Sequence, residues 1–330
     1  MPRLQAWLFE RWYGDHPPGL LLRGLGRFWG GLMLLRRWLY RQGLLPRPAL
    51  PIPVLVVGNR SVGGAGKTPV VIALAQALAA RGWRVGVVSR GYGRRSREAL
   101  RVEAGMAAER CGDEPLLIHH ETGLPVEVDA DRVAAVARLA ATGCTLAIAD
   151  DGLQHLRLTR RIELEVEDGR GLGNGRVLPA GPLREPLPAV PAFARIVHGR
   201  APREGEVPLQ LRLDEAQALD DGRRQPLSDF AGQRLRALAG IGDPTRFFAA
   251  LRDQGLDIEP WPFPDHHAFC AADFAGLSGL PLLMTGKDAV KCRQFGLANT
   301  WVVPLRATLP DAFLDRLDAA LRAPRADAPA

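Results

Sequence analysis

The sequence holds one run of small residues that ends in lysine and threonine, Gly63-Gly64-Ala65-Gly66-Lys67-Thr68. Backbone N–H groups that no Cβ atom obstructs can surround a phosphate chain, and a helix N-terminus favours anions. In such a loop the lysine reaches the β- and γ-phosphates of ATP, and the threonine hydroxyl holds Mg²⁺. The strict motif has glycine at position 61, where this chain has Ser61. Residues 63–68 therefore predict a variant phosphate-binding loop, with Lys67 also acting in catalysis.

Two adjacent carboxylates, Asp150 and Asp151, follow an apolar stretch at 146–149. A carboxylate at the end of a hydrophobic strand is how proteins with this loop hold Mg²⁺, directly or through water. An Asp-Asp pair at a strand end is also a common turn when it stands alone. Together with Thr68, the pair predicts a metal site.

Two further polar groups, Asp113 and His266, are candidates for handling the proton of an acceptor hydroxyl. A phosphotransferase needs a group that accepts or orients this proton. Asp113 starts a predicted helix and has the alternative role of its N-cap. His266 lies in the run Asp265-His266-His267, which has no partner at a spacing typical of zinc sites. Spacing alone does not decide between a catalytic and a purely structural role for either residue.

The elements that position these groups alternate between strands and helices. Apolar strands are predicted at 54–58, 85–89 and 144–149, and helices at 67–81 and 131–141. Such alternation predicts a parallel sheet covered on both faces, with ligands at the carboxyl ends of its strands. The predicted fold class is α/β: a P-loop NTPase-type parallel sheet with helices on both faces, a smaller C-terminal α/β subdomain and an N-terminal amphipathic helix.

The length of 330 residues fits two domains. We predict an amphipathic helical segment, a P-loop domain, a β-hairpin linker, a C-terminal α/β subdomain and a disordered tail, at 1–45, 46–205, 206–228, 229–322 and 323–330. The linker prediction depends on Asp221-Gly222, a hairpin signal between strands predicted at 209–213 and 224–227.

Positive charge and tryptophan gather in the first 50 residues. Eight arginines, only two acidic residues and four of the seven tryptophans lie there. Between residues 19 and 41 apolar residues recur at helical spacing, but arginines interrupt them, so the segment does not span a bilayer. A helix rich in arginine and tryptophan is typical of segments that lie in the headgroup layer of an anionic membrane. The alternative is a helix that packs on the catalytic domain, and the two roles are compatible.

Composition argues against several other classes of protein. The four cysteines are scattered, which is typical of a reducing compartment and of neither a disulfide scaffold nor a zinc site. The basic N-terminal segment holds more tryptophan and leucine than nucleic-acid binding requires, so we expect no nucleic acid partner. No sequence feature points to an obligate protein partner.

In their order along the chain, these motifs resemble those of the tetraacyldisaccharide 4′-kinases, the lipid A 4′-kinase family. The most specific part is Asp150-Asp151-Gly152-Leu153-Gln154-His155 combined with the loop at 62–69. The other matching motifs lie at 57–59, 89–93, 112–115, 178–185, 239–242 and 263–267. The resemblance covers nearly the whole chain, and the family does not keep glycine at the position of Ser61.

The resemblance implies transfer of the γ-phosphate of ATP, with Mg²⁺, to the 4′-hydroxyl of tetraacyldisaccharide 1-phosphate, giving lipid IVA in lipid A biosynthesis. It implies a peripheral enzyme at the cytoplasmic face of the bacterial inner membrane, whose partners are the acylated disaccharide phosphate lipid and the anionic membrane surface. It also implies that Asp113 and His266 act together as base, and that Asp150 and Asp151 belong to the metal and phosphate site.

Two residues are candidate contacts to the substrate. Tyr92 lies in a loop bracketed by glycines, and Arg184 carries a guanidinium that can bind phosphate through two parallel hydrogen bonds. A surface arginine is an equally weighted alternative for Arg184. The family usually has glutamate where this chain has Gly286, so we assign no role to Gly286 and a structural or substrate role to Lys287.

Two other functions compete with a lipid kinase. A P-loop ATPase switch of the partitioning or metallochaperone type usually carries lysine directly before the two glycines of the loop, where this chain has Val62. A kinase of a soluble small molecule would use the N-terminal helix only as a structural element. Deletion of residues 1–45 separates these functions, because only a lipid kinase should lose much of its turnover.

Overall fold

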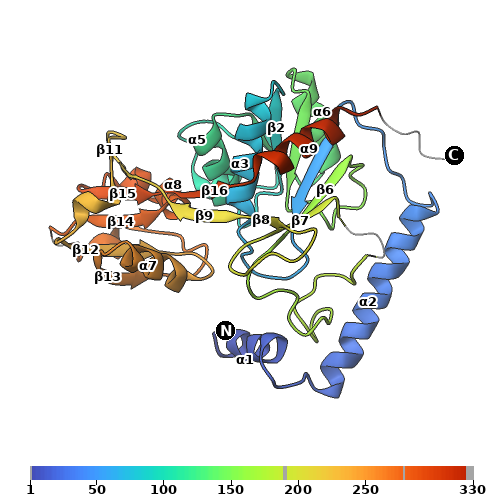
Figure 1. Cartoon of the computed structure of the whole chain (residues 1–330), viewed down its shortest axis with the longest axis horizontal. Coiled ribbons are helices and arrows are strands. Elements are labelled where there is room, and N and C mark those ends of the chain that lie inside the picture. Colours follow the sequence, from blue (N-terminus) through green and yellow to red (C-terminus); the bar gives the residue numbers. More distant parts are fainter. Residues whose placement is uncertain (1, 189–191, 278, 325–330) are drawn as a thin grey trace.

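The computed structural model describes residues 2–188, 192–277 and 279–324 (Figure 1). A larger and a smaller sheet are joined by a two-stranded ribbon, and of the two N-terminal helices the first lies at the bottom of the view and the second along its right-hand edge. Of the predicted disordered tail at 323–330, residues 325–330 lie outside the described residues.

The larger sheet has eight strands in the order β3-β4-β2-β5-β1-β6-β7-β8. These strands are β1 (Val54–Gly58), β2 (Val85–Ser89), β3 (Leu100–Arg101), β4 (Val126–Val128), β5 (Leu146–Asp150), β6 (Ile162–Glu167), β7 (Ala194–Val197) and β8 (Val207–Pro208). All neighbours are parallel except the edge pair β3–β4. The predicted parallel sheet is confirmed.

Helices cover both faces of this sheet (Figure 1). They are α3 (Lys67–Ala80), α4 (Ala108–Cys111), α5 (Asp113–Thr122), α6 (Arg132–Ala141) and α9 (Asp311–Arg322). Side chains alternate between the faces of a strand, so Leu55 and Val57 share a core with α3, while Val54 and Val56 share one with α6. Burial on both faces explains why β1 is a continuous apolar run.

The smaller sheet has six strands in the order β11-β10-β15-β14-β12-β13. Its elements are β10 (Ala216–Ala218), β11 (Arg224–Gln225), β12 (Arg234–Ala239), β13 (Asp257–Pro262), β14 (Leu282–Thr285), β15 (Thr300–Val303), α7 (Pro244–Asp253) and α8 (Gly286–Cys292). Short 3₁₀ helices span Leu227–Phe230, Ala271–Phe274 and Arg293–Phe295. The smaller domain has two hydrophobic clusters that are separate from the core of the larger sheet, as expected for the predicted second α/β unit.

An antiparallel ribbon of β9 (Gln210–Leu213) and β16 (Leu305–Thr308) joins the two sheets. The predicted pairing of 209–213 with 224–227 is therefore wrong. A turn does lie at Asp221-Gly222, but it joins β11 to β10, a short strand that the sequence pattern did not reveal. Because β10 also pairs with β15, the predicted hairpin linker is in part an edge of the smaller sheet.

The helix α9 returns to the larger domain after the chain has crossed the ribbon a second time. Its apolar residues Phe313, Leu314 and Leu317 lie in the same core as α3. Trp83 Nε1 also donates a hydrogen bond to Asp318. The predicted boundary, which grouped everything from 229 to 322, is corrected at this helix because its apolar face is buried in the larger core.

Two helices precede the larger sheet, α1 (Pro2–Tyr13) and α2 (Leu20–Arg41). The helix predicted within 19–41 corresponds to α2. One side of α2 buries Gly26 and Gly30 against Val177, Ala180 and Pro186. Its other side exposes apolar side chains, at Leu21, Leu25, Phe28, Leu32 and Leu35. In the described part of the chain, no helix has both the length and the apolar composition that crossing a membrane requires.

Candidate active site

The predicted phosphate-binding loop links β1 to α3 near the centre of the larger sheet. Gly63 and Gly66 have φ angles of 104° and 73°, which L side chains rarely adopt, so both positions favour glycine. The helix α3 begins at Lys67, and the N–H groups of its first turn have no partner within the helix. This geometry leaves backbone donors free for an anion at the helix N-terminus.

Two side chains that the sequence analysis did not single out hold the loop from outside. Arg170 donates to the carbonyl oxygen of Gly64 at 3.1 Å, and His198 Nε2 lies 3.1 Å from the carbonyl oxygen of Ala65. Burial lowers the pKa of His198, so its neutral ring can donate an Nε2–H to that carbonyl. A Cβ at Gly66 would lie 2.9 Å from the same nitrogen, a second reason for glycine there.

Lys67 extends from the loop toward the end of β5. Its Nζ donates to Asn59 Oδ1 at 3.0 Å and lies 3.7 Å from Asp151 Oδ1. The ammonium group of Lys67 is therefore held between the phosphate-binding loop and the carboxylates predicted to bind the metal. At this position it can balance the negative charge of a triphosphate.

Asp150 ends β5, and only 1% of its surface is exposed. Ser89 Oγ donates to Oδ2 at 3.4 Å, whereas Oδ1 has no hydrogen-bond partner among the described residues. Burial, with the nearby charges of Glu114 and Asp151, raises the pKa of Asp150 to about 7. A buried oxygen without a partner is costly unless a ligand takes it up, and carboxylate oxygens are the donors that Mg²⁺ prefers. This position therefore fits a magnesium ion.

Asp151 has a φ of 49°, and its carboxylate is held by two cations. Arg184 Nη1 donates to both of its oxygens at 2.8 and 2.7 Å, in addition to the contact with Lys67. Burial opposes ionisation, but the charges of Lys67 and Arg184 outweigh it and lower the pKa of Asp151. Arg184 is therefore a partly buried, paired residue beside the predicted metal site, unlike the free surface arginine of the alternative interpretation.

Asp113 and His266 come from different domains and meet in one hydrogen bond. Asp113 begins α5, His266 lies in the loop after β13, and His266 Nδ1 is 2.9 Å from Asp113 Oδ2. Burial opposes the ionisation of Asp113, but the bond from His266 and the charge of Lys287 outweigh it and lower the pKa of Asp113. The same bond raises the pKa of His266, against burial and Lys287. The ionised carboxylate of Asp113 and the protonated imidazole of His266 are thus both favoured.

The structure does not support the alternative in which Asp113 serves as a helix cap. Gly112 occupies the N-cap position of α5, and Asp113 is the first residue of the helix. Its Oδ1 accepts a hydrogen bond from the backbone N–H of Glu114 at 3.0 Å, which leaves Oδ2 for the partner in the other domain.

Lys287, in the first turn of α8, completes this cluster. Its Nζ lies 3.3 Å from Glu114, 3.6 Å from Asp265, 3.7 Å from Asp113 and 3.5 Å from His266 Nε2. Burial alone would lower a lysine pKa, but the three carboxylates outweigh it and raise the pKa of Lys287. A fixed positive charge therefore ties the two domains together at the predicted base.

Two further positions named in the sequence analysis border this cluster. The ring of Tyr92 lies 5.2 Å from that of His266 and is largely exposed, so one side of the ring is open to a ligand. A Cβ at Gly286 would lie 3.2 Å from Leu117 Cδ1, so a side chain at this first residue of α8 would press on α5.

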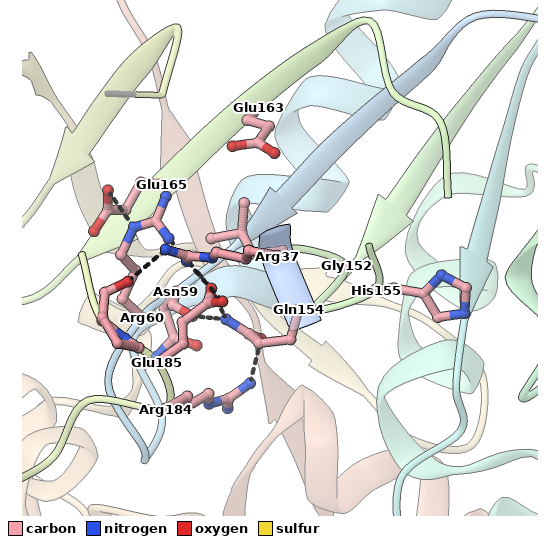
Figure 2. A network of polar contacts seen from close by, with 12 residues as sticks. Arg37, Asn59, Arg60, Gly152, Gln154, His155, Glu163, Glu165, Arg184 and Glu185 are labelled. Carbon is pink, nitrogen blue, oxygen red and sulfur yellow. Dashed lines mark hydrogen bonds and ion pairs between the residues drawn. The ribbon is translucent and has the colours of Figure 1, made fainter. Parts of the chain in front are cut away.

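A polar network next to Arg184 connects its loop to the sheet (Figure 2). Gln154 Nε2 donates to the carbonyl oxygen of Asn59 at 3.3 Å and to Glu185 Oε1 at 3.1 Å. Arg60 Nη1 donates to the same oxygen of Glu185 at 3.3 Å, and Gln154 Oε1 accepts from Arg184 at 3.4 Å. Since the side chain of Asn59 holds Lys67, the network reaches the phosphate-binding loop as well.

The predicted site residues thus form a nucleotide group and an acceptor group. The nucleotide group holds the loop 63–68, Asp150, Asp151 and Arg184, and the acceptor group holds Asp113, His266 and Tyr92. The two groups lie near each other: Ser89 Oγ, which donates to Asp150, accepts from the backbone N–H of Gly91, and a Cβ at Gly112, next to Asp113, would lie 3.1 Å from Gly91 Cα. No cluster of three or more His, Cys, Asp or Glu residues suited to a metal occurs within the described residues. A magnesium ion would therefore need Thr68, phosphate oxygens or water as further ligands.

The residues that sequence reasoning missed are those whose partners are remote in the chain. Arg170 lies 106 positions from its loop partner, and His198 lies 133 positions from its own. Neither belongs to a recognisable local pattern. Lys287 was not missed, since the sequence analysis gave it a structural or substrate role, and it stands out as one of only three lysines in a chain that otherwise uses arginine.

Comparisons with known proteins show which family the chain resembles over nearly its whole length. The family model described as tetraacyldisaccharide-1-P 4′-kinase, LpxK, matches residues 19–322. The tetraacyldisaccharide 4′-kinase of Stenotrophomonas maltophilia is 49% identical, over 93% of this chain and 95% of its own length. That of Xanthomonas euvesicatoria pv. vesicatoria is 50% identical, over 93% and 94% respectively.

The fold is also similar to a solved structure, the crystal structure of LpxK from Aquifex aeolicus in complex with ATP. The TM-score is 0.75, with 27% sequence identity, and the match covers 90% of this chain and 96% of that one. The likeness therefore extends over both sheets and is not limited to the phosphate-binding half.

Proposed function

The chain belongs to the tetraacyldisaccharide-1-P 4′-kinase family, and from that premise we propose how its own residues carry out the reaction. It is an ATP-dependent kinase that phosphorylates the 4′ position of a tetraacyldisaccharide 1-phosphate in lipid A biosynthesis. The comparisons give no support to a partitioning-type ATPase switch or to a kinase of a soluble molecule.

The nucleotide group binds and neutralises the triphosphate. Backbone donors of residues 63–68 and the first turn of α3 surround the β- and γ-phosphates, while Lys67 balances their charge. Thr68, Asp150 and Asp151 are the residues that would hold Mg²⁺, which when bound offsets negative charge on the phosphates. Among the residues that the structure describes, Asp150 Oδ1 has no hydrogen-bond partner, which supports this assignment.

The acceptor group removes the proton of the 4′-hydroxyl. Asp113 Oδ2 and His266 Nδ1 are 2.9 Å apart, so a proton that reaches either group is shared along this bond. Lys287 holds the carboxylates from both domains around the pair and keeps the base positioned. Tyr92, beside His266, offers an exposed ring on which a sugar can pack.

The single observation that carries this proposal is the hydrogen bond between Asp113 and His266 across the two domains. This bond pairs the candidate base Asp113 with a second titratable group from the other domain, an arrangement that a nucleotide switch does not need. Transfer to an acceptor other than water requires such a base to be sheltered, and Asp113 is 5% exposed.

The test compares acceptors for the purified wild-type chain with ATP and Mg²⁺ in detergent micelles. A lipid kinase forms a bis-phosphorylated product from tetraacyldisaccharide 1-phosphate, much less from the deacylated disaccharide phosphate, and little free phosphate without acceptor. Equal rates on both acceptors would support a soluble substrate. Rapid ATP hydrolysis with neither acceptor phosphorylated would contradict the kinase.

The exposed face of α2 supports a membrane role at the cytoplasmic side of the bacterial inner membrane, where ATP is available. Leu21, Phe28 and Leu35 are 76%, 68% and 52% exposed on a helix whose opposite side is packed on the protein. Exposed apolar side chains on a basic helix are the composition of interfacial segments. We propose that this face enters the headgroup layer where the acylated substrate lies.

Binding to vesicles that contain phosphatidylglycerol tests the membrane role. The double variant L21S/F28S should bind up to about a thousand-fold more weakly, since each of the two apolar side chains contributes about 2 kcal/mol when it is buried. Leu305→Ser removes an apolar side chain that is 44% exposed on the β9–β16 ribbon and should leave binding unchanged. Equal binding of the two variants would contradict the role of α2.

A further inference from the structure

The helix α2 contacts the nucleotide end of the site as well as facing outward. Three of its side chains hold backbone oxygens there: Trp29 Nε1 donates to Arg184 at 3.3 Å, Arg36 to Gln154 at 3.4 Å and Arg37 to Pro186 at 2.8 Å. The first of these oxygens belongs to Arg184, which binds the carboxylate of Asp151. The second belongs to Gln154, whose side chain accepts a hydrogen bond from Arg184. Thus α2 is fastened to the loop that carries Arg184.

Arg37 makes the strongest of these connections. Besides its bond to Pro186, it forms an ion pair of 2.7 Å with Glu185 Oε2, and the two side chains are 14% and 5% exposed. The other oxygen of Glu185 accepts from Gln154 and from Arg60. A buried carboxylate keeps its orientation only while its charged partners remain, so removal of Arg37 leaves one side of Glu185 without a partner.

Figure 2 shows the contacts from Glu185 through Gln154 to Arg184 and Asn59, and from these two residues they continue to both ends of the phosphate site. In one direction Gln154 Oε1 accepts from Arg184, which binds Asp151 at 2.7 Å. In the other direction Gln154 holds the backbone of Asn59, whose side chain accepts from Lys67. Every step is a hydrogen bond or ion pair of 3.4 Å or less.

We propose that Arg37 is a positioning residue for the phosphate site. Through Glu185 and Gln154 it sets Arg184 and Asp151, so the helix that faces the lipid also orders the nucleotide end. Outer partners of metal-binding groups typically change affinity or activity by about 10- to 100-fold when they are removed. The inference uses the proposed kinase function for its turnover readout, whereas its readout in ATP binding is independent of any acceptor.

The experiment compares Arg37→Ala with Arg41→Ala in the full-length chain. Arg41 lies in the last turn of the same helix, is exposed and forms no ion pair within the described residues, so its removal costs the same charge without breaking the network. Three quantities are measured: the Kd for ATP without lipid, kcat/KM for ATP at saturating acceptor, and binding to anionic vesicles.

We expect Arg37→Ala to weaken ATP binding and to lower kcat/KM for ATP by about ten-fold. Arg41→Ala should stay within about two-fold of wild type in both, and the two variants should bind vesicles equally. If Arg37→Ala matches Arg41→Ala in ATP handling, or loses turnover only in proportion to vesicle binding, the positioning role is wrong. A wild type without kinase activity would overturn the proposed function, while the ATP Kd values would still decide this inference.

A conservative variant covers the case in which Arg37→Ala does not fold, as judged by its melting transition. Arg37→Lys keeps the charge but offers a single ammonium in place of a fork that reaches both Glu185 and Pro186. It should show a smaller loss in the same direction, about three-fold. Wild-type ATP affinity in Arg37→Lys, together with a full loss in Arg37→Ala, would mean that charge alone positions Glu185. Wild-type affinity in both variants overturns the proposal.

Discussion

The nucleotide end of the site comes from neighbouring strands of one sheet, whereas the acceptor end is assembled from two sheets. The phosphate-binding loop follows β1, and Asp150 ends β5, which pairs with β1 in register Val57 to Asp150. Asp113 and His266 are 153 positions apart and belong to different domains. The first arrangement is fixed by local topology, and the second depends on how the two sheets sit against each other.

This difference predicts which kinetic quantity each half controls. Groups that bind the triphosphate act on ATP in the ground state and the transition state alike, so their loss should change ATP affinity as well as turnover. A base that meets only the acceptor hydroxyl should change turnover and leave ATP affinity intact. The comparison fails if a change in one half produces the signature of the other.

The largest effect is expected for Lys67→Ala in the nucleotide half. The ammonium is held beside Asp151 at 3.7 Å, and its loss removes the charge that balances the β- and γ-phosphates. The rate of phosphoryl transfer should fall by at least about 10³-fold, which is the upper end of the range seen when one charge-stabilising donor is removed. ATP affinity should fall as well. Product formation and calorimetric ATP binding check this, and retained activity would remove the phosphate-binding assignment.

Asp113→Ala should produce the opposite signature in the acceptor half. We expect kcat to fall by about 10²- to 10⁴-fold, the range for loss of a general base, with an ATP Kd within about two-fold of wild type. Asp253→Ala removes an exposed carboxylate at the end of α7, so it serves as the matched control with wild-type kinetics. A loss confined to ATP affinity would make Asp113 a binding residue.

The pH dependence of kcat sharpens the role of His266. Its hydrogen bond to Asp113 raises its pKa above 6.5, and a protonated imidazole cannot accept another proton, so the rate should fall as pH drops through a value above 6.5. In His266→Ala we expect a smaller loss than in Asp113→Ala and a displaced acidic limb. In Asp113→Asn the bond that raises the pKa of His266 is lost, while burial and Lys287, which lower this pKa, and Asp265, which raises it, remain, so the limb should move to lower pH. An unchanged profile in both variants would argue against a basic role.

The two halves also differ in how far the sequence predicts them. The loop 63–68 and Asp150-Asp151 could be placed because a strand, a glycine run and a helix follow one another and leave a local pattern. The sequence named Asp113 and His266 as separate candidates, and only the family resemblance joined them. Their hydrogen bond depends on the packing of α5 against α8, which no spacing encodes.

Two sequence-based predictions failed because the partner of an element is remote in the chain: the pairing of one strand and the domain assignment of one helix. Strand β9 pairs with β16 near the other end of the chain, and α9 packs beside α3 after the smaller domain is complete. The amphipathic pattern at 19–41 correctly predicted a helix with an apolar face, but it did not show that Gly26 and Gly30 mark the opposite, packed side. The packed side can be recognised only when the loop that contacts it is known.

The smallest expected effect tests whether this packed side of α2 belongs to the nucleotide half. A Cβ at Gly26 would lie 2.9 Å from both Ala180 Cβ and the carbonyl oxygen of Val177, so Gly26→Ala must displace α2 or the loop that leads to Arg184. Overpacking of this kind costs about 1–3 kcal/mol. A methyl group added at Gly31, on the same helix, would meet nothing within 4 Å, so Gly31→Ala should stabilise the helix by about 0.5–1 kcal/mol.

If α2 positions the phosphate site, Gly26→Ala should lower the melting temperature and raise the KM for ATP by a few-fold, whereas Gly31→Ala should do neither. Both substitutions add one methyl group to the same helix, so helix propensity and apolar area cancel in the comparison. Vesicle binding should change little in both, since neither substitution removes an exposed apolar side chain. A KM for ATP that is unchanged in Gly26→Ala despite a lower melting temperature would limit α2 to its proposed membrane contact and leave the nucleotide half independent of this helix.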